Sequence, residues 1–213
     1  GVLAKGETVI ENAAREPEIV QLCDALNTMG ANIDGISTDK IIIEGVEELQ
    51  SADLDVIPDR IEAGTYLIAG AAMGEITLNY CNPNHLDVLI EKLIQAGAII
   101  DTSENSISIK KANPINPVDV TTEVYPGFPT DLQAQLMAMM CLADGHSKIC
   151  ETIFENRFMH VPELVRMGAD IQVEGRIALV RGKVSLLPAP VRATDLRASV
   201  SLVLAALEPK VSL

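Results

Sequence analysis

One short pattern occurs three times in this chain at a nearly constant interval. An apolar stretch with helical spacing runs into Gly-Ala, and an alternating apolar segment follows, at Gly30, Gly97 and Gly168. The intervals between these glycines are 67 and 71 residues. This recurrence is too long for a solenoid repeat and fits a supersecondary unit of two helices and several strands. We therefore expect the chain to use one such unit three times.

Two further series of residues recur with the same spacing. Glycines stand in front of segments that alternate in polarity, at Gly6, Gly74 and Gly145. Aspartates open alanine-rich apolar stretches, at Asp59, Asp131 and Asp195. Three series in step make it improbable that the first pattern arose by chance, and they mark the same points in each unit.

The first unit carries the signals of a strand, a helix and a hairpin. Residues 5–10 are expected to hold the end of a helix and then a strand. Pro17 stands where a helix can begin without losing a hydrogen bond. Gly30 is expected to end that helix in a left-handed conformation. Two short strands are predicted at Ile33 and at residues 41–43.

The other units repeat this order behind an additional helix. Helices are predicted at residues 59–73, 85–95, 131–142, 158–167 and 193–206, the last of them starting a fourth unit. Strands are predicted at residues 75–78, 98–100, 106–109, 147–150, 171–173 and 177–180. Two stretches with proline and asparagine or arginine, residues 112–118 and 187–192, are expected to link the units.

The helix that opens each unit is rich in small apolar residues. Residues 69–72 read Ala-Gly-Ala-Ala, and Ala198, Ala205 and Ala206 occur in the last helix. A helix that is apolar on all sides is buried. We therefore expect one helix per unit inside the fold, with the more polar helices and the sheets outside, which is the reverse of an ordinary α/β barrel.

Charge and cysteine usage exclude several classes of protein. The formal net charge is −14, which argues against a general surface for nucleic acid or anionic membranes, because both need clustered Lys and Arg. A local arginine pocket for one small anion remains compatible with it. The four cysteines form no Cys-x-x-Cys pair, so neither a zinc site nor a disulfide framework is expected, and we predict reduced thiols in a cytoplasmic protein.

Two features concern the ends and the membrane. No segment is long and apolar enough to span a bilayer, and no signal peptide is visible. The chain begins at Gly1 without a methionine, and we therefore expect a fragment or a processed product.

Four sequence blocks carry a resemblance to a known family. They are residues 11–18, 129–135, 154–160 and 193–199. In this order and spacing they closely resemble the UDP-N-acetylglucosamine 1-carboxyvinyltransferase family, enolpyruvyl transferases that commit UDP-GlcNAc to peptidoglycan. The resemblance extends over nearly the whole chain. The first and third blocks argue against the related enolpyruvyl transferase of the shikimate pathway, which shares the fold.

The resemblance implies an α/β fold of the inverse α/β barrel type. Each of two family domains has three βαβαββ units with pseudo-threefold symmetry, and this chain has about three of the six units. Residues 1–52 would be the last unit of one domain, and residues 53–213 most of the second. The family's amino-terminal Lys-Asn pair, its cysteine-bearing loop and a late arginine have no counterpart here, so the chain alone is expected to be inactive.

Asp131 is the candidate catalytic residue. Its position at the start of a helix recurs at Asp59 and Asp195, so a carboxylate that only interacts with the helix dipole is the simpler interpretation. By resemblance, Asp131 instead contacts the sugar 3-hydroxyl and serves as its general base or hydrogen-bond acceptor. The residues alone leave both interpretations open.

The same resemblance implies five substrate contacts. Ile153 and Phe154 stand at a strand end, where core packing is the alternative, and Ile153 would touch UDP-GlcNAc partly through backbone groups. Arg157 is either a solvated surface charge or a cleft residue that faces the anionic substrates. Asp195 and Arg197 lie in the fourth block, and the guanidinium of Arg197 suits the phosphate or carboxylate of phosphoenolpyruvate because it binds such anions bidentately.

The remaining polar and thiol side chains receive structural interpretations. Glu155 is expected to hold one of the arginines in place. His85 and His160 are expected to have surface or capping roles rather than catalytic ones. Each cysteine is expected to be a buried structural thiol. No cofactor and no metal site is predicted.

Two functional hypotheses from different classes remain. In the first, the chain is part of a transferase that moves the enolpyruvyl group of phosphoenolpyruvate to the 3-hydroxyl of UDP-GlcNAc, a step of cell wall biogenesis that bears on cell shape and division. In the second, it is a stand-alone structural or ligand-binding module of the same fold without catalysis. The expected partners are the two small-molecule substrates, with no nucleic acid and no membrane.

Overall fold

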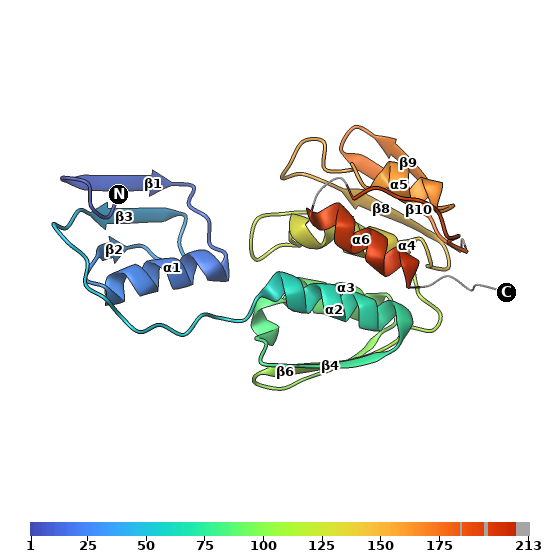
Figure 1. Ribbon diagram of the computed structural model, residues 1–213, viewed down its shortest axis with the longest axis horizontal. Coiled ribbons are helices and arrows are strands. Elements are labelled where there is room, and N and C mark those ends of the chain that lie inside the picture. The colour runs from blue at the N-terminus through green and yellow to red at the C-terminus, as the bar shows by residue number, and fades with distance from the viewer. Residues whose placement is uncertain (184, 194–195, 208–213) are drawn as a thin grey trace. The chain divides into compact units, whose positions relative to one another are not determined.

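The computed structural model describes residues 1–183, 185–193 and 196–207, without the side chains of Arg197 and Ala198. The chain divides into two compact units (Figure 1). The first comprises Gly1–Ile57 with Val124–Pro126, and the second comprises Pro58–Glu123 with Gly127–Leu213. Among the described residues, no helix has the length and apolar character needed to cross a membrane.

The first unit is a three-stranded sheet with one helix. Its elements are β1 (Glu7–Glu11), α1 (Pro17–Thr28), β2 (Asn32–Asp34) and β3 (Lys40–Glu44). Strand β3 lies in the middle and pairs antiparallel with both neighbours. Its core consists of buried side chains from α1, β2 and β3, namely Cys23, Ile33, Ile41 and Ile43. This small core is separate from that of the second unit.

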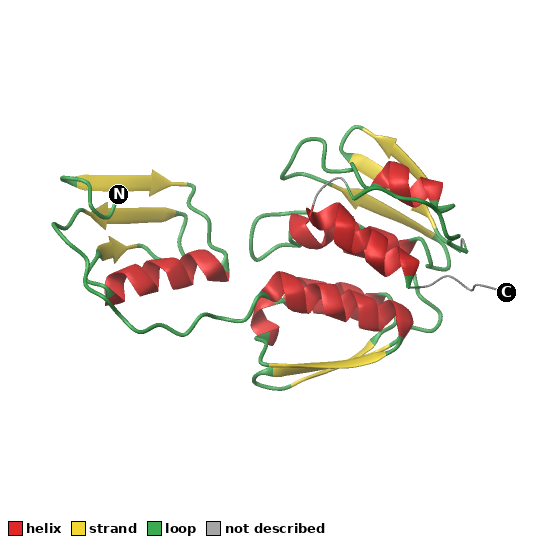
Figure 2. Cartoon of the chain, viewed as in Figure 1, coloured by secondary structure: helices red, strands yellow, loops and turns green. Residues whose placement is uncertain are grey.

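The second unit contains the other two repeats (Figure 2). The elements of the second repeat are α2 (Arg60–Met73), β4 (Glu75–Asn79), the 3₁₀ turn η1 (Pro83–His85), α3 (Asp87–Gln95), β5 (Ile99–Thr102) and β6 (Ser106–Lys110). Those of the third are β7 (Val120–Thr121), the 3₁₀ turn η2 (Thr130–Leu132), α4 (Gln133–Met140), β8 (His146–Cys150), α5 (Val161–Arg166), β9 (Asp170–Glu174) and β10 (Ile177–Arg181). Helix α6 (Leu196–Ala206) follows.

All three repeats share one strand topology. The strand orders are β1-β3-β2, β4-β6-β5 and β8-β10-β9, and every pairing within them is antiparallel. In the third repeat β7 adds to β8 in parallel, which completes the order β-α-β-α-β-β. The predicted repeating unit is therefore confirmed at the level of topology, and the described residues form open sheets rather than a closed barrel.

The recurring Gly-Ala pattern marks the same helix end in each repeat. Gly30, Gly97 and Gly168 have φ angles of +97°, +100° and +97°. In each case the glycine N–H bonds a carbonyl three residues back, and the next alanine N–H bonds one five residues back. These two bonds define a Schellman motif, in which the left-handed position favours glycine. The motif turns the chain from the second helix of the repeat into the hairpin.

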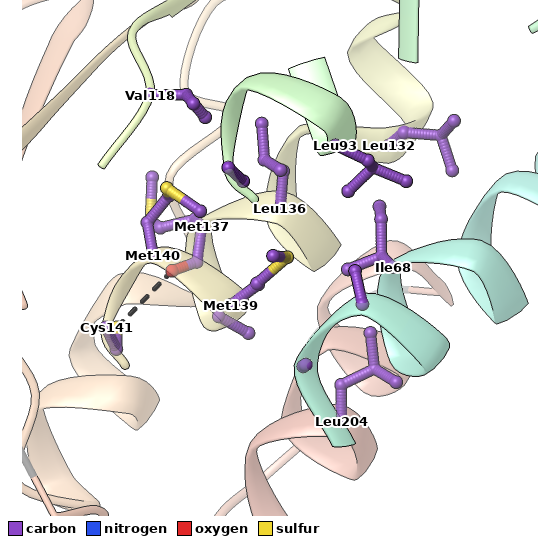
Figure 3. Packing of buried hydrophobic residues seen from close by; sticks show 14 of the residues in the cluster. Ile68, Leu93, Val118, Leu132, Leu136, Met137, Met139, Met140, Cys141 and Leu204 are labelled. Carbon is purple, nitrogen blue, oxygen red and sulfur yellow. Dashed lines mark hydrogen bonds between the residues drawn. The ribbon is translucent and has the colours of Figure 1, made fainter. Parts of the chain in front are cut away.

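The predicted burial is confirmed for α4, whereas α2 and α6 each keep an exposed side, with Tyr66 51% and Val203 59% exposed. Every residue of α4 is buried, and α4 contacts both α2 and α6. Figure 3 shows Ile68 of α2, Leu204 of α6 and the methionines of α4 in one cluster. Gly64 of α2 permits close approach, because a Cβ there would lie 2.4 Å from Leu132 Cδ1. The sheets flank this layer of helices, so α4 is enclosed by other elements of the second unit.

Several predicted element bounds are wrong. The helix predicted over residues 131–142 begins as the 3₁₀ turn η2 and ends at Met140. The helix predicted over residues 158–167 is only Val161–Arg166, because the preceding residues form a turn in which Val161 N–H bonds Phe158 O at 3.0 Å. Strand β7 was not predicted, since two residues are too few to show alternation.

Candidate functional site

Asp131 and Asp59 occupy equivalent sequence positions but make different contacts. Asp59 is the N-cap of α2, and its Oδ1 accepts from Ile61 N–H at 2.7 Å and Glu62 N–H at 3.1 Å. Asp131 lies inside η2, and its Oδ1 accepts from Arg157 Nη2 at 2.6 Å. The dipole interpretation therefore describes Asp59, whereas the carboxylate of Asp131 is engaged with a cation from another segment.

Arg157 is neither a solvated surface charge nor an isolated one. Its side chain is 25% exposed and that of Asp131 is 35% exposed, so this ion pair is partly buried but open to solvent. The guanidinium also lies over the ring of Phe154, with 4.9 Å from Cζ to the ring centroid. A cation held by a carboxylate and an aromatic face is restricted in orientation. The structure thus places Arg157 in contact with two other predicted site residues, Asp131 and Phe154.

The backbone around Ile153 and Phe154 is held by a buried carboxylate. Glu151, directly after β8, is 1% exposed. Its Oε1 accepts from the N–H groups of Ile153 at 2.9 Å and Phe154 at 3.0 Å. The N–H of Ile153 therefore already has an internal partner. The Phe154 side chain is 48% exposed, so core packing does not account for its position.

Two hydroxyls complete the bonding of Glu151. Thr122 Oγ1 donates to Oε1 at 2.9 Å, and Thr130 Oγ1 donates to Oε2 at 2.8 Å. Four donors therefore satisfy one buried carboxylate, which is what burial of a charge requires. Sequence reasoning missed Glu151, because a glutamate after a strand looks like any solvated carboxylate. The sequence Thr-Asp at residues 130–131 did not indicate that the threonine hydroxyl donates a hydrogen bond to Glu151.

Glu155 pairs with a different arginine from those predicted. Glu155 Oε1 lies 3.7 Å from Arg176 Nη2, and this pair is largely exposed. The arginine that it holds belongs to the turn between β9 and β10 and was not among the predicted site residues. Arg176 Nη1 also donates to Thr152 O at 2.8 Å. Arg176 and Arg157 both line an open hollow of about 270 Å³ next to Phe154 and Glu151.

Two predicted site residues cannot be placed. Asp195 lies outside the described residues, and for Arg197 only the backbone is described, within α6. Their proposed contacts with phosphoenolpyruvate therefore stay predictions.

His160 and Cys150 differ from their predicted surroundings, whereas His85 and the other cysteines agree with theirs. His85 Nε2 lies 3.0 Å from Asn82 Nδ2 at the turn η1. His160 is buried, 3.2 Å from Met137 Sδ, so a surface role is wrong for it. Three cysteines are buried, whereas Cys150 is half-buried. Within the described residues, no cluster of His, Cys, Asp or Glu is arranged to hold a metal ion.

Burial governs the thiol chemistry of the buried cysteines. It raises the pKa of the Cys141 thiol to about 12, and it raises the pKa values of Cys23 and Cys81 above the ordinary value of 9.0. Cys141 Sγ also lies 3.3 Å from Met137 O, the contact drawn as a dashed line in Figure 3. These thiols stay protonated and unreactive at neutral pH.

Comparison with known proteins decides the family. A sequence profile described as EPSP synthase (3-phosphoshikimate 1-carboxyvinyltransferase) matches residues 1–212. The chain belongs to this family. The match extends across both compact units, so it does not depend on a single motif.

Curated relatives within the family are similar to this chain along nearly all of it. The UDP-N-acetylglucosamine 1-carboxyvinyltransferase of Acidobacterium capsulatum is 56% identical over 208 residues, which cover 97% of this chain and 48% of the relative. The protein of the same name from Geobacter metallireducens is 56% identical over 206 residues, which cover 96% and 49%. The chain therefore spans about half the length of the curated relatives it matches.

Solved structures of the family support the fold. The enolpyruvyl transferase NikO from Streptomyces tendae superposes with a TM-score of 0.85 at 26% identity, covering 98% of this chain and 50% of that one. EPSP synthase from Acinetobacter baumannii gives a TM-score of 0.67 at 19% identity, covering 97% and 52%. The second likeness concerns the fold alone. The α/β class and the enolpyruvyl transferase type of fold are thus confirmed.

Proposed function

We propose that this chain is part of an enolpyruvyl transferase that moves the enolpyruvyl group of phosphoenolpyruvate to the 3-hydroxyl of UDP-GlcNAc and releases phosphate. The single observation that carries this proposal is the contact between Asp131 and Arg157 at the start of a buried helix. The transfer needs a base for a hydroxyl and cations for two anionic substrates. A carboxylate held by an arginine meets both needs in one place.

The roles of the side chains follow from their chemistry. Asp131 would accept the proton of the sugar hydroxyl, or its hydrogen bond, as the oxygen attacks the enol carbon. Arg157 would orient Asp131 before substrate binds and then face the anionic groups. Phe154, half-exposed beside them, would pack on the sugar. Asp195 and Arg197 would contribute to phosphoenolpyruvate binding, as their sequence block implies.

The division into two compact units fits a transferase built from two domains. We infer that residues 1–52 are the last repeat of one domain and residues 53–213 most of a second domain. The remaining repeats would supply the acid that protonates the methylene carbon. In a bacterial cell this activity would belong to the cytoplasmic stage of peptidoglycan synthesis, with consequences for cell shape and division.

The acceptor specificity provides the test. A full-length protein that carries this sequence is incubated with phosphoenolpyruvate and either UDP-GlcNAc or shikimate 3-phosphate, and product is followed by mass spectrometry together with phosphate release. Enolpyruvyl-UDP-GlcNAc is expected. Product from shikimate 3-phosphate alone would favour the other transferase reaction of this family, and no product from either would favour a non-catalytic module.

The isolated chain is expected to be inactive. Groups that act as a unit lose nearly all activity when part of the set is removed. Phosphate release by the 213-residue chain should therefore not exceed a blank without protein. Release above the blank that Asp131→Ala abolishes would contradict this expectation.

A further inference from the structure

Two chain segments meet at the candidate site, and they are joined by two different bonds. The first is the ion pair of Arg157 with Asp131, 2.6 Å long and open to solvent. The second is more enclosed: Thr130, directly before Asp131 and itself half-buried, donates its hydroxyl to Glu151 Oε2 at 2.8 Å. Glu151 is 1% exposed. The ion pair is therefore open to solvent, whereas the carboxylate of the second link is almost fully withdrawn from it.

The second oxygen of Glu151 holds the opposite segment. Oε1 accepts from the N–H groups of Ile153 and Phe154 at 2.9 and 3.0 Å, and these residues lead into Arg157. It also accepts from Thr122 Oγ1 at 2.9 Å. Thr122 follows β7, and its N–H bonds Cys150 O at 2.9 Å. The carboxylate thus connects both sides of the site to the sheet.

The ion pair of Asp131 with Arg157 is unsuited to hold the site during the reaction. When Asp131 accepts a proton or turns toward a hydroxyl, its attraction to Arg157 falls, because the charge that Arg157 pairs with is reduced or redirected. The bonds of Glu151 involve neither the carboxylate of Asp131 nor the guanidinium of Arg157. They therefore persist through the step in which the ion pair changes.

We propose that Glu151 is a positioning residue that keeps Asp131 at a constant distance from the 153–157 segment through the hydroxyl of Thr130. This inference rests on the proposed function, since it gives Asp131 a task that needs fixed geometry. A misplacement of about 1 Å costs on the order of a hundredfold in rate. A role confined to stability predicts a lower melting temperature without a specific loss of turnover.

The first test removes only the bond between Thr130 and Glu151, in a full-length protein that carries this sequence. Thr130→Val should lower kcat about tenfold or more, while KM for UDP-GlcNAc changes less than about threefold, because the groups that bind substrate remain. Thr130→Ser, which keeps the hydroxyl, should restore kcat. The matched control is Thr77→Val, whose hydroxyl bonds Ser108 Oγ at 2.9 Å in the exposed sheet β4-β6 and whose kcat should stay unchanged.

A double-mutant cycle separates positioning from general stability. If Thr130 acts through Asp131, adding Thr130→Val to Asp131→Asn should produce no further loss of kcat. A loss that multiplies with that of Asp131→Asn would overturn the proposal, because it would show an effect independent of Asp131. Equal kcat for Thr130→Val and the unaltered protein would overturn it as well.

Glu151 itself offers a second measurement should Thr130→Val not fold. Glu151→Asp keeps the charge but shortens the reach by one methylene, so kcat should fall about tenfold or more. Glu151→Gln keeps the reach, since its amide can donate to the Thr130 hydroxyl, and kcat should stay within about threefold. The reverse order of the two variants would show that charge, not position, matters, and would overturn the proposal.

The outcome also separates this role from the proposed function. If the unaltered full-length protein makes no enolpyruvyl-UDP-GlcNAc, the proposed function and the role of Glu151 are both overturned. If it makes the product and Asp131→Asn is impaired while Thr130→Val is not, only the role of Glu151 is overturned.

Discussion

The repeat supplies an internal control for the role of Asp131. Asp59 and Asp131 stand at equivalent positions, so the same substitution, Asp→Asn, tests two different environments. Asp59 caps α2 through two N–H groups. Asparagine caps nearly as well as aspartate, so Asp59→Asn loses only the interaction of the charge with the helix dipole, about 0.3–1 kcal/mol.

Asp131→Asn should cost little stability and much activity. The pair with Arg157 is 25% and 35% exposed, and ion pairs of this kind contribute about 0–1 kcal/mol. The amide oxygen of asparagine can still accept from Arg157, so part of that contribution remains. If Asp131 handles the hydroxyl proton, however, kcat should fall roughly 10²-fold or more, which is about 2.7 kcal/mol of barrier.

The assay compares both variants in a full-length protein that carries this sequence. Melting temperatures should fall by no more than about 4 °C for either variant, as a loss near 1 kcal/mol implies for a domain of this size. Phosphate release with both substrates should separate them, with Asp59→Asn near the unaltered rate and Asp131→Asn far below it. Equal, mild effects on turnover would refute the reasoning and return Asp131 to a helix-end role.

Two further predictions concern stability of the chain itself. Burial raises the pKa of the Cys141 thiol from 9.0 to about 12, so between these pH values the thiol loses its proton in the unfolded chain but keeps it in the folded one. The free energy of unfolding should therefore fall by roughly 1.4 kcal/mol per pH unit above pH 9. Urea titrations at several pH values should show a less steep fall for Cys141→Ala, and equal slopes for the two proteins would contradict this. Gly168→Ala should lose about 1–2 kcal/mol because Gly168 has φ +97°, the left-handed region where a Cβ is strained. Gly74→Ala is the control, since Gly74 has φ −172° and open space around its Cβ position. Equal urea midpoints for the two variants would show that the left-handed conformation of Gly168 is not what makes its substitution costly.

The architecture of the repeats was predictable because it depends on local signals. Gly30, Gly97 and Gly168 predicted helix ends, and Schellman bonds are present at all three. The alanine-rich composition of residues 69–72 predicted a buried helix, since no face of it is polar. Element bounds were less predictable, as the turn before α5 shows, because the ends of a short helix readily change into tight turns with hydrogen bonds three residues apart.

Three residues that lie together at the candidate site were predicted, but their arrangement was not. Asp131, Phe154 and Arg157 were predicted from the resemblance, which does not indicate that Arg157 contacts both the carboxylate and the aromatic ring. Glu151 was missed because its importance comes from burial, and burial of a single polar residue leaves no periodic trace in a sequence.

The sequence by itself determined the repeating unit, its buried helices and the family, because these depend on periodicity and on residues close together in the chain. Only the tertiary structure decided which of two equivalent aspartates caps a helix and which meets an arginine 26 residues away. The physical reason is that a carboxylate takes whichever donors the fold brings to it. At Asp59 these are the N–H groups of its own helix, and at Asp131 the loop after β8 brings a guanidinium within 2.6 Å.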